Sequence, residues 1–246
     1  MKRFGFSCTQ FCVVMIFVLT SCGGSEEKTT TDTTTTVSDT TTTTTAPATS
    51  TISTTPEHIM LARHRVKDYA KWKVSYDEHD SMRLANGLRN YVIGRGLEDS
   101  NMILVAVKAE DVAKAKAFAK DPSLKTAMQK GGVTGTPTFR FTTVVYQDNA
   151  PNMSALRSMT MFTVKDWDAW KRSFDSSRQL RIDNGLTDRA YGYDVDDNHK
   201  VVLVVAINDS AKANAFWKGD VIKQRRAASG VIGEPQRFIY RVVERY

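Results

Sequence analysis

VKDYAKWK, at residues 66–73, recurs as VKDWDAWK at residues 164–171. The same offset of 98 residues aligns Asn-Gly-Leu at 86–88 with Asn-Gly-Leu at 184–186, without a gap. About 28 of 80 positions are identical in this one register, which is too many for chance. The sequence therefore indicates a tandem duplication, with one unit at residues 56–150 and a second at residues 151–246.

Each copy predicts the order strand, helix, strand, strand, helix, strand. Residues 59–66 alternate as a half-buried strand does. Asp68 stands where a helix N-cap belongs, and Gly87 offers the left-handed residue that ends a helix. This order gives an antiparallel sheet with both helices on one face, so two bare faces can bury each other. The expected strands are 59–66, 91–95, 102–107 and 139–146, then 158–164, 190–195, 201–207 and 238–243; a second helix is expected at 110–119, followed by a turn or short helix that ends at 131–132.

The shared motifs resemble a known superfamily. V-x-D-[YW]-x-x-W-K, N-G-L, an Ala/Lys-rich helix and G-V-x-G-x-P are similar to the dimeric α/β-barrel superfamily of ferredoxin-like proteins, which includes antibiotic-biosynthesis-monooxygenase-type domains. The resemblance covers residues 57–147 and 155–246. It implies an α+β fold of two ferredoxin-like βαββαβ units packed sheet to sheet as an intramolecular dimeric α/β barrel, and hence a monomer with an internal pseudo-dimer. Members include cofactor-free oxygenases, haem-degrading enzymes, isomerases and proteins of no assigned activity, so the resemblance assigns no catalytic residue.

The N-terminus predicts export and lipidation. Lys2 and Arg3 precede an apolar run at 11–19 that is too short to cross about 30 Å of hydrocarbon. Leu-Thr-Ser-Cys at 19–22 resembles a bacterial lipobox, so we expect a signal peptide at 1–21 and an acylated, palmitate-type lipid anchor on Cys22. The alternative is a buried helix that happens to end in cysteine. Lipidation would place the protein in the cell envelope, on the outer-membrane, periplasmic or surface side, with membrane lipid as its partner.

Residues 22–55 are predicted to form a tether. From residue 29 to 55 there are 17 threonines and no aromatic residue. Such a chain cannot bury enough apolar surface to offset the entropy of ordering, so we expect disorder. Asp-Thr-Thr at 32–34 and 39–41 is similar to a bacterial O-glycosylation acceptor, and a bare spacer is the alternative.

One face of the first expected helix suggests a pocket. Trp72, Tyr76, His79 and Arg83 follow at i, i+4, i+7 and i+11, and this set could hold a planar anionic ligand. We therefore name five ligand-binding candidates, which are Trp72, Tyr76, Arg83, Trp170 and Arg181. The alternative is that the aromatic residues are ordinary core and the arginines form surface ion pairs.

No catalytic residue is assigned, and His64 and His79 are weak candidates. His64 shares a face of the first strand with Met60 and Ala62, and that face or its opposite would line the barrel interior. Its counterpart Phe162 favours a packing role. His79 lies between two acidic residues, which favours a solvated histidine over a base.

Composition limits the partners. The four histidines lack metal-ligand spacing, so we expect no metal and no cofactor. The net charge of +7 gathers in the second unit, at 223–226 and at residues 237, 241 and 245. Nucleic acid is an improbable partner for an exported protein, whereas lipid head groups, anionic polysaccharide or plain solvent could face these charges.

Three functions remain open. The leading one is a membrane-anchored lipoprotein of unassigned activity that binds a small molecule or an envelope partner in or beside its barrel. The second is a cofactor-independent monooxygenase-like enzyme on an aromatic substrate, with the first unit carrying the reactive groups in a cavity of several hundred cubic ångströms. The third is a purely structural envelope module. Whether the protein is an enzyme is left open.

Overall fold

A computed structural model describes residues 51–151 and 154–246. The expected signal peptide, Cys22 and most of the tether lie outside the described residues. Ala48–Tyr246 forms one compact unit. No helix within the described part of the chain is long and apolar enough to cross a membrane.

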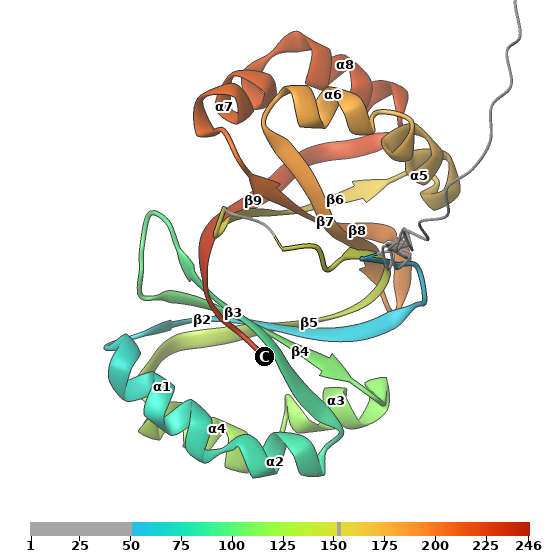
Figure 1. Ribbon diagram of the computed structural model, residues 1–246. Helices are drawn as coiled ribbons and strands as arrows, with labels where there is room; N and C mark the ends of the chain where they lie inside the picture. Colours follow the sequence, from blue (N-terminus) through green and yellow to red (C-terminus); the bar gives the residue numbers. More distant parts are fainter. Residues whose placement is uncertain (1–50, 152–153) are drawn as a thin grey trace, which may run out of the picture. The chain divides into compact units, whose positions relative to one another are not determined.

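The two sequence copies fold as two βαββαβ halves (Figure 1). The prediction of fold class is confirmed, although the first expected helix of each copy is split in two. The first half contains β2 (Glu57–Val66), α1 (Tyr69–Glu78), α2 (Asp80–Ala85), β3 (Leu88–Gly96), β4 (Met102–Ala109), α3 (Val112–Phe118), α4 (Pro122–Lys130) and β5 (Val133–Asp148). The second contains β6 (Leu156–Val164), α5 (Trp167–Asp175), α6 (Arg178–Asp183), β7 (Leu186–Asp194), β8 (Asp197–Ile207), α7 (Ser210–Lys218), α8 (Asp220–Ala228) and β9 (Val231–Arg245).

Local signals set the helix ends. The Asp68 carboxylate accepts a hydrogen bond from the backbone N–H of Lys71 at 2.8 Å, and Asp166 caps α5 in the same way. Gly87 and Gly185 have φ of 67° and 72°, which is the left-handed region that ends a helix at little cost for glycine. The single helix expected up to Gly87 is wrong, because the chain leaves helical geometry at His79, with φ −97° and ψ 18°.

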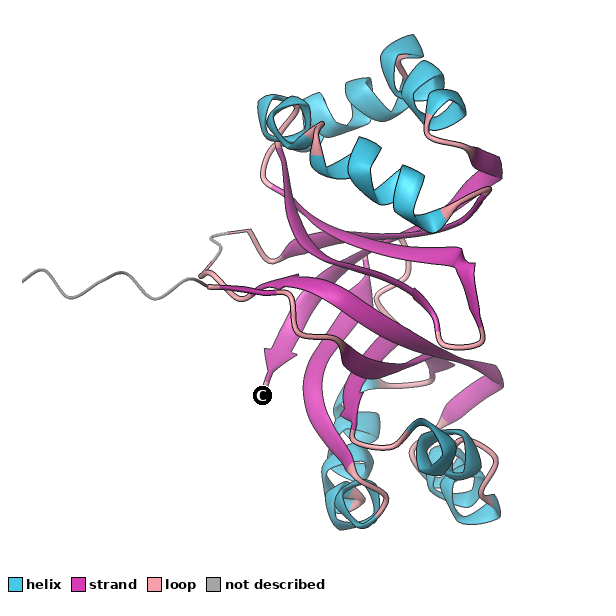
Figure 2. Cartoon of the chain, turned by 90° about the vertical axis from the view of Figure 1, so that its right-hand side faces the viewer, coloured by secondary structure: helices cyan, strands magenta, loops and turns pink. Residues whose placement is uncertain are grey.

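Two long strands join the halves into a closed barrel. β5 pairs with β2 of its own half and then with β7, whereas β9 pairs with β6 and then with β3. Among the described residues, the strand order β5-β2-β4-β3-β9-β6-β8-β7 therefore returns to β5. The helices of each half cover the outside of the barrel (Figures 1 and 2). The sequence predicted that the sheets bury each other, and the structure adds that their edges are hydrogen-bonded.

Aligned glycines lie at both seams of the barrel. Gly94 of β3 pairs with Val242 of β9, and Gly192 of β7 pairs with Val144 of β5. A Cβ on Gly94 would lie 2.2 Å from the Tyr240 ring, and one on Gly192 would lie 2.0 Å from a backbone carbonyl oxygen. These positions therefore need glycine for close approach of the strands.

The two faces of β2 belong to two different hydrophobic clusters. Met60 and Ala62 pack with Trp72 of α1 on the outer, helix-covered face. Ile59 and Leu61 pack inside the barrel. The face of β2 that lines the barrel interior is therefore the one opposite His64.

The end of the predicted tether is ordered. Ile52–Ser53 forms the short strand β1, in which Ile52 pairs with Asp148 and Ser53 with Gln147 of β5. The prediction of disorder up to residue 55 is therefore wrong for these residues, because the edge of β5 offers backbone groups for pairing.

Candidate functional site

Each half holds a cavity between its helices and the outer face of the barrel. The cavity of the second half measures about 100 Å³ and that of the first about 70 Å³. The same sequence offset of 98 relates most of their lining residues. We call them the second-half pocket and the first-half pocket.

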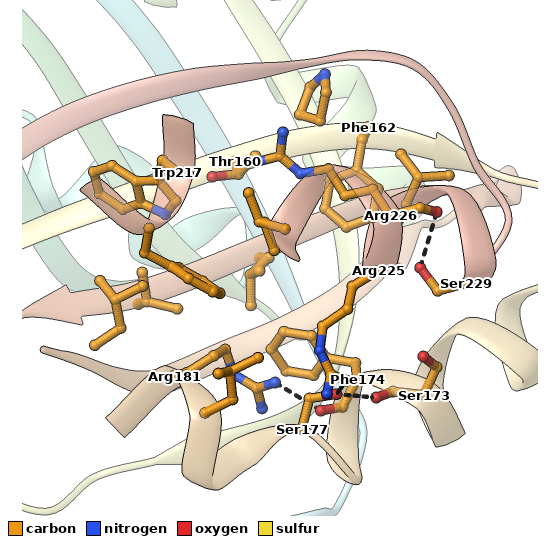
Figure 3. A pocket seen from close by; sticks show the side chains of 18 of the residues that line it. Thr160, Phe162, Ser173, Phe174, Ser177, Arg181, Trp217, Arg225, Arg226 and Ser229 are labelled. Carbon is orange, nitrogen blue, oxygen red and sulfur yellow. Dashed lines mark hydrogen bonds between the residues drawn. The ribbon is translucent and has the colours of Figure 1, made fainter. Parts of the chain in front are cut away.

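The second-half pocket has an apolar wall that includes several aromatic rings (Figure 3). Trp170 stacks on Phe174 with ring centres 5.0 Å apart, and Phe162 tilts against Trp170 at 5.4 Å. α5 and β6 supply these rings because their apolar faces are turned toward each other. The other aromatic residues of the wall come from α7, and they are Phe216 and Trp217.

Three arginines lie around this wall. Arg225 of α8 donates a hydrogen bond to Ser177 Oγ at 2.7 Å, and Arg226 follows it along the helix (Figure 3). The Arg237 guanidinium lies 4.0 Å from the centre of the Trp217 ring. Among the described residues, these three arginines form no ion pair with a carboxylate. Positive charge is therefore gathered beside an apolar wall without a neutralising partner.

Burial changes the pKa of two of these arginines, Arg226 and Arg237. Burial, together with the smaller contribution of the nearby Arg226 charge, lowers the pKa of Arg237 to about 10. Burial also lowers the pKa of Arg226, against the opposing influence of Glu234. Both groups stay protonated at neutral pH, so the pocket keeps its positive charge. An anion would relieve the cost of holding these charges partly out of water.

The two arginines predicted to bind a ligand, Arg83 and Arg181, both have partners within the protein. Arg181 is 7% exposed and donates to both oxygens of Asp188 at 2.7 and 2.6 Å, and to the Phe174 carbonyl at 2.7 Å. Its guanidinium also lies 3.5 Å from the centre of the Phe174 ring. Arg181 therefore ties the end of α5 to β7. The alternative interpretation as a surface ion-pairing residue is wrong.

Arg83 does the same in the first half. It is 6% exposed, donates to the Tyr76 carbonyl at 2.8 Å and to Asn90 Oδ1 at 2.9 Å, and pairs with Asp80 at 3.1 Å. The helix break at His79 lets its guanidinium reach back to the last turn of α1. For Arg83, too, the surface interpretation is wrong.

The first-half pocket contains both candidate histidines. His64 is 4% exposed, and neither ring nitrogen has a hydrogen-bond partner. Burial lowers its pKa to about 4, so the imidazole is neutral at physiological pH. His79 is half-buried, and its Nδ1 lies 2.6 Å from the Ser75 carbonyl oxygen. Trp72 lies beside His64 with ring centres 5.5 Å apart, and Tyr76 stacks on Trp72 at 5.1 Å.

The structure thus brings the predicted residues of each half into one pocket. Trp72, Tyr76, His79 and Arg83 meet with His64, and Trp170 meets Arg181 in the second half. The first-half pocket is far smaller than the several hundred cubic ångströms expected for an enzyme. In the described ranges, no three His, Cys, Asp or Glu side chains converge as a metal site would require.

The three pocket arginines were not predicted as a site. In the sequence they stand out only as part of a basic region. The offset of 98 carries a usable signal, because Arg225, Arg226 and Arg237 stand opposite apolar residues of the first copy. Those residues are Ala127, Met128 and Phe139.

No protein-family model matches the chain, and no curated protein matches it. The chain is similar to a putative monooxygenase from Fusobacterium nucleatum subsp. nucleatum ATCC 25586, with a TM-score of 0.51 and 13% identity over 77% of this chain and 93% of that one. It is also similar to an anthrone oxidase-like protein, with a TM-score of 0.52 and 14% identity over 76% and 92% of the two chains. The fold is a ferredoxin-like dimeric α/β barrel. At such low identity these similarities establish the fold alone.

Proposed function

We propose that this protein is a membrane-anchored bacterial lipoprotein whose second-half pocket binds a small organic anion. The observation that carries the proposal is the group of three arginines without a carboxylate partner among the described residues, beside an aromatic wall. Guanidinium groups bind carboxylates through paired, charge-assisted hydrogen bonds, and the aromatic wall accepts an apolar body.

The size of the pocket limits the ligand. A cavity of 150 Å³ holds a benzene ring, and the second-half pocket measures about 100 Å³. A single-ring carboxylate therefore fits with its ring partly inside and its charge at the arginines. Benzoate is a suitable probe, and benzyl alcohol is its uncharged control.

The binding experiment uses the compact unit Ala48–Tyr246, which contains every described element. Calorimetric titration is expected to show benzoate binding at least tenfold tighter than benzyl alcohol. The double variant Arg226→Met and Arg237→Phe installs the residues of the first half, and we expect it to lose about tenfold or more in benzoate affinity. Lys223→Met removes an exposed charge of α8 outside the pocket and should change affinity by less than about twofold. Equal binding of both probes, or an unchanged double variant, would contradict the proposal.

The anchor needs its own experiment. The support is the order of positive residues, apolar run and Leu-Thr-Ser-Cys at 19–22. The full chain, expressed in bacteria grown with an alkyne-tagged palmitate, should incorporate the label and fractionate with membranes. Cys22→Ala should remove the label. Label that persists in this variant would show that Cys22 is not the lipidated residue.

One observation favours a second candidate function, a cofactor-independent monooxygenase-like enzyme. His64 is a buried imidazole without a partner, and it lines the first-half pocket beside Trp72. It could hydrogen-bond a phenolic substrate there. This candidate predicts oxygen uptake with a hydroquinone probe, and loss of that uptake in His64→Phe. If uptake is absent or survives His64→Phe, the binding function stands without the enzyme.

A further inference from the structure

A third cavity lies inside the barrel, on the opposite face of the sheet from both pockets. It measures about 80 Å³, and both halves contribute to it. Most of its wall is apolar. The apolar lining includes Ile59, Leu61, Val92, Leu104, Val204 and Val242.

Three arginines stand at one end of this cavity, and we call them the barrel-mouth arginines: Arg157 of β6, Arg189 of β7 and Arg245 of β9. Arg157 is 3% exposed and Arg189 is 7% exposed. Arg157 and Arg245 also line an open groove of about 270 Å³ at the surface. The barrel interior therefore adjoins this groove at its charged end.

The barrel-mouth arginines have too few acidic partners to neutralise their positive charge. Arg189 lies 3.5 Å from the Asp148 carboxylate. Arg157 donates to the carbonyl oxygens of Ser154 and Leu156, at 2.6 and 2.9 Å, and forms no ion pair with any carboxylate among the described residues. The charges that shift its pKa are those of Arg245 and Arg189, and the other titratable groups that act on it are Tyr240 and Tyr91.

An uncompensated buried cation is costly. Burial, together with the smaller contribution of the Arg245 charge, lowers the pKa of Arg157 to about 10. Arg157 is nevertheless charged at neutral pH, so the free-energy cost of burying this charge lowers the stability of the folded state. A carboxylate placed between these arginines would remove that cost.

We infer that the barrel interior is a second ligand site, which takes a short-chain aliphatic carboxylate with its head at the barrel-mouth arginines and its chain along the apolar interior. The cavity volume of about 80 Å³ encloses only a few carbon atoms. The methyl end of a short chain therefore lies inside, and the rest of the chain and the carboxylate extend to the arginines and the adjoining groove. The site is separate from the second-half pocket, because the β-sheet lies between them. It also requires both halves, because the three arginines belong to the second half and both halves contribute apolar residues to the wall.

The test compares hexanoate, hexanol and acetate by calorimetric titration against Ala48–Tyr246. Hexanoate is expected to bind at least tenfold tighter than hexanol, which lacks the charge, and tenfold tighter than acetate, which lacks the chain. Equal affinity for hexanol would overturn the role of the arginines. Equal affinity for acetate would overturn the role of the apolar interior.

Two variants separate this site from the proposed function. Arg157→Met should weaken hexanoate binding at least tenfold and leave benzoate binding unchanged. Arg237→Phe should do the reverse, so either proposal can fail alone. Without ligand, Arg157→Met should also raise the Tm, because a buried charge without a partner is removed. Unchanged hexanoate affinity in Arg157→Met overturns the inference.

A spectroscopic measurement keeps the inference testable if Arg157→Met does not fold. In the wild-type fragment, the methyl protons of bound hexanoate should show intermolecular NOEs to the methyl groups of Ile59 and Val204. NOEs only to residues of the second-half pocket, or none at all, would place the chain outside the barrel and overturn the inference.

Discussion

The first-half and second-half pockets share a scaffold and differ in their lining. Both keep a tryptophan and a serine on the first helix and an arginine after the break, which are Trp72, Ser75 and Arg83 in one half and Trp170, Ser173 and Arg181 in the other. The first has His64 and His79 where the second has Phe162 and Ser177, and the second has three arginines where the first has apolar residues. The residues that hold a helix on the sheet are thus retained in both halves, whereas several residues that face the cavity have diverged.

The retained arginines also differ in their partners, and this gives the largest expected effect. Arg181→Met leaves the Asp188 carboxylate buried at 4% exposure with only the partly exposed Arg178 nearby, at 3.5 Å. We expect a loss of about 3–5 kcal/mol in the free energy of unfolding. Arg83→Met leaves the neutral Asn90 amide, so the loss should be about 1–3 kcal/mol. Urea denaturation of both variants measures the difference, and equal losses would show that Asp188 does not distinguish the halves.

The next effect is a pH dependence that only the first half should show. The pKa of His64 is about 4 in the folded chain and about 6.5 in the unfolded chain. The unfolded chain therefore binds the proton first, and stability falls as the pH drops from about 6.5 through 4. This amounts to about 3 kcal/mol of lost stability at and below pH 4.

His64→Phe provides the matched control, because phenylalanine occupies the equivalent position of the second half. The difference in unfolding free energy between wild type and His64→Phe, measured from pH 7 to pH 4, should follow this curve. A difference that does not vary with pH would mean that His64 is protonated without penalty in the folded protein.

A single added methyl group at either barrel seam, β3–β9 or β5–β7, should lower the stability of the fold. A Cβ at residue 192 would lie 2.0 Å from the Thr143 carbonyl oxygen, which is backbone and cannot turn aside. Gly192→Ala is expected to cost about 1–3 kcal/mol. At residue 94 the obstacle is the Tyr240 ring, so Gly94→Ala combined with Tyr240→Leu should recover part of its loss. Thermal denaturation compares the three variants, and a neutral Gly192→Ala would show that this seam is not tightly packed.

The smallest effect comes from moving the arginines between halves. Met128→Arg with Phe139→Arg should give the first-half pocket a positive charge and about a tenfold gain in benzoate affinity, or about 1.4 kcal/mol. The measurement is made in the Arg226→Met and Arg237→Phe background, so that only the new site can bind. Absence of any gain would show that charge alone does not define the site, and that Trp217 is also needed.

Much of the architecture could be predicted from the sequence alone. Local or periodic signals can be recognised without the tertiary structure. They are the offset of 98 residues, the caps at Asp68 and Asp166, and the glycines that end the helices. The same holds for the grouping of Trp72, Tyr76 and His79 on one helical face.

Tertiary structure decided what the local pattern could not. The seams of β5 and β9, the burial of Arg83 and Arg181, and the order at Ile52–Ser53 depend on pairing between residues far apart in sequence. The pocket arginines meet because α8 and β9 converge on one aromatic wall. The barrel-mouth arginines meet because the first parts of β6 and β7 and the end of β9 line the same cavity. The order of charged residues along a chain does not say which of them lie close together in space. Only the closed barrel determines which cations lie in water and which share a cavity without a partner.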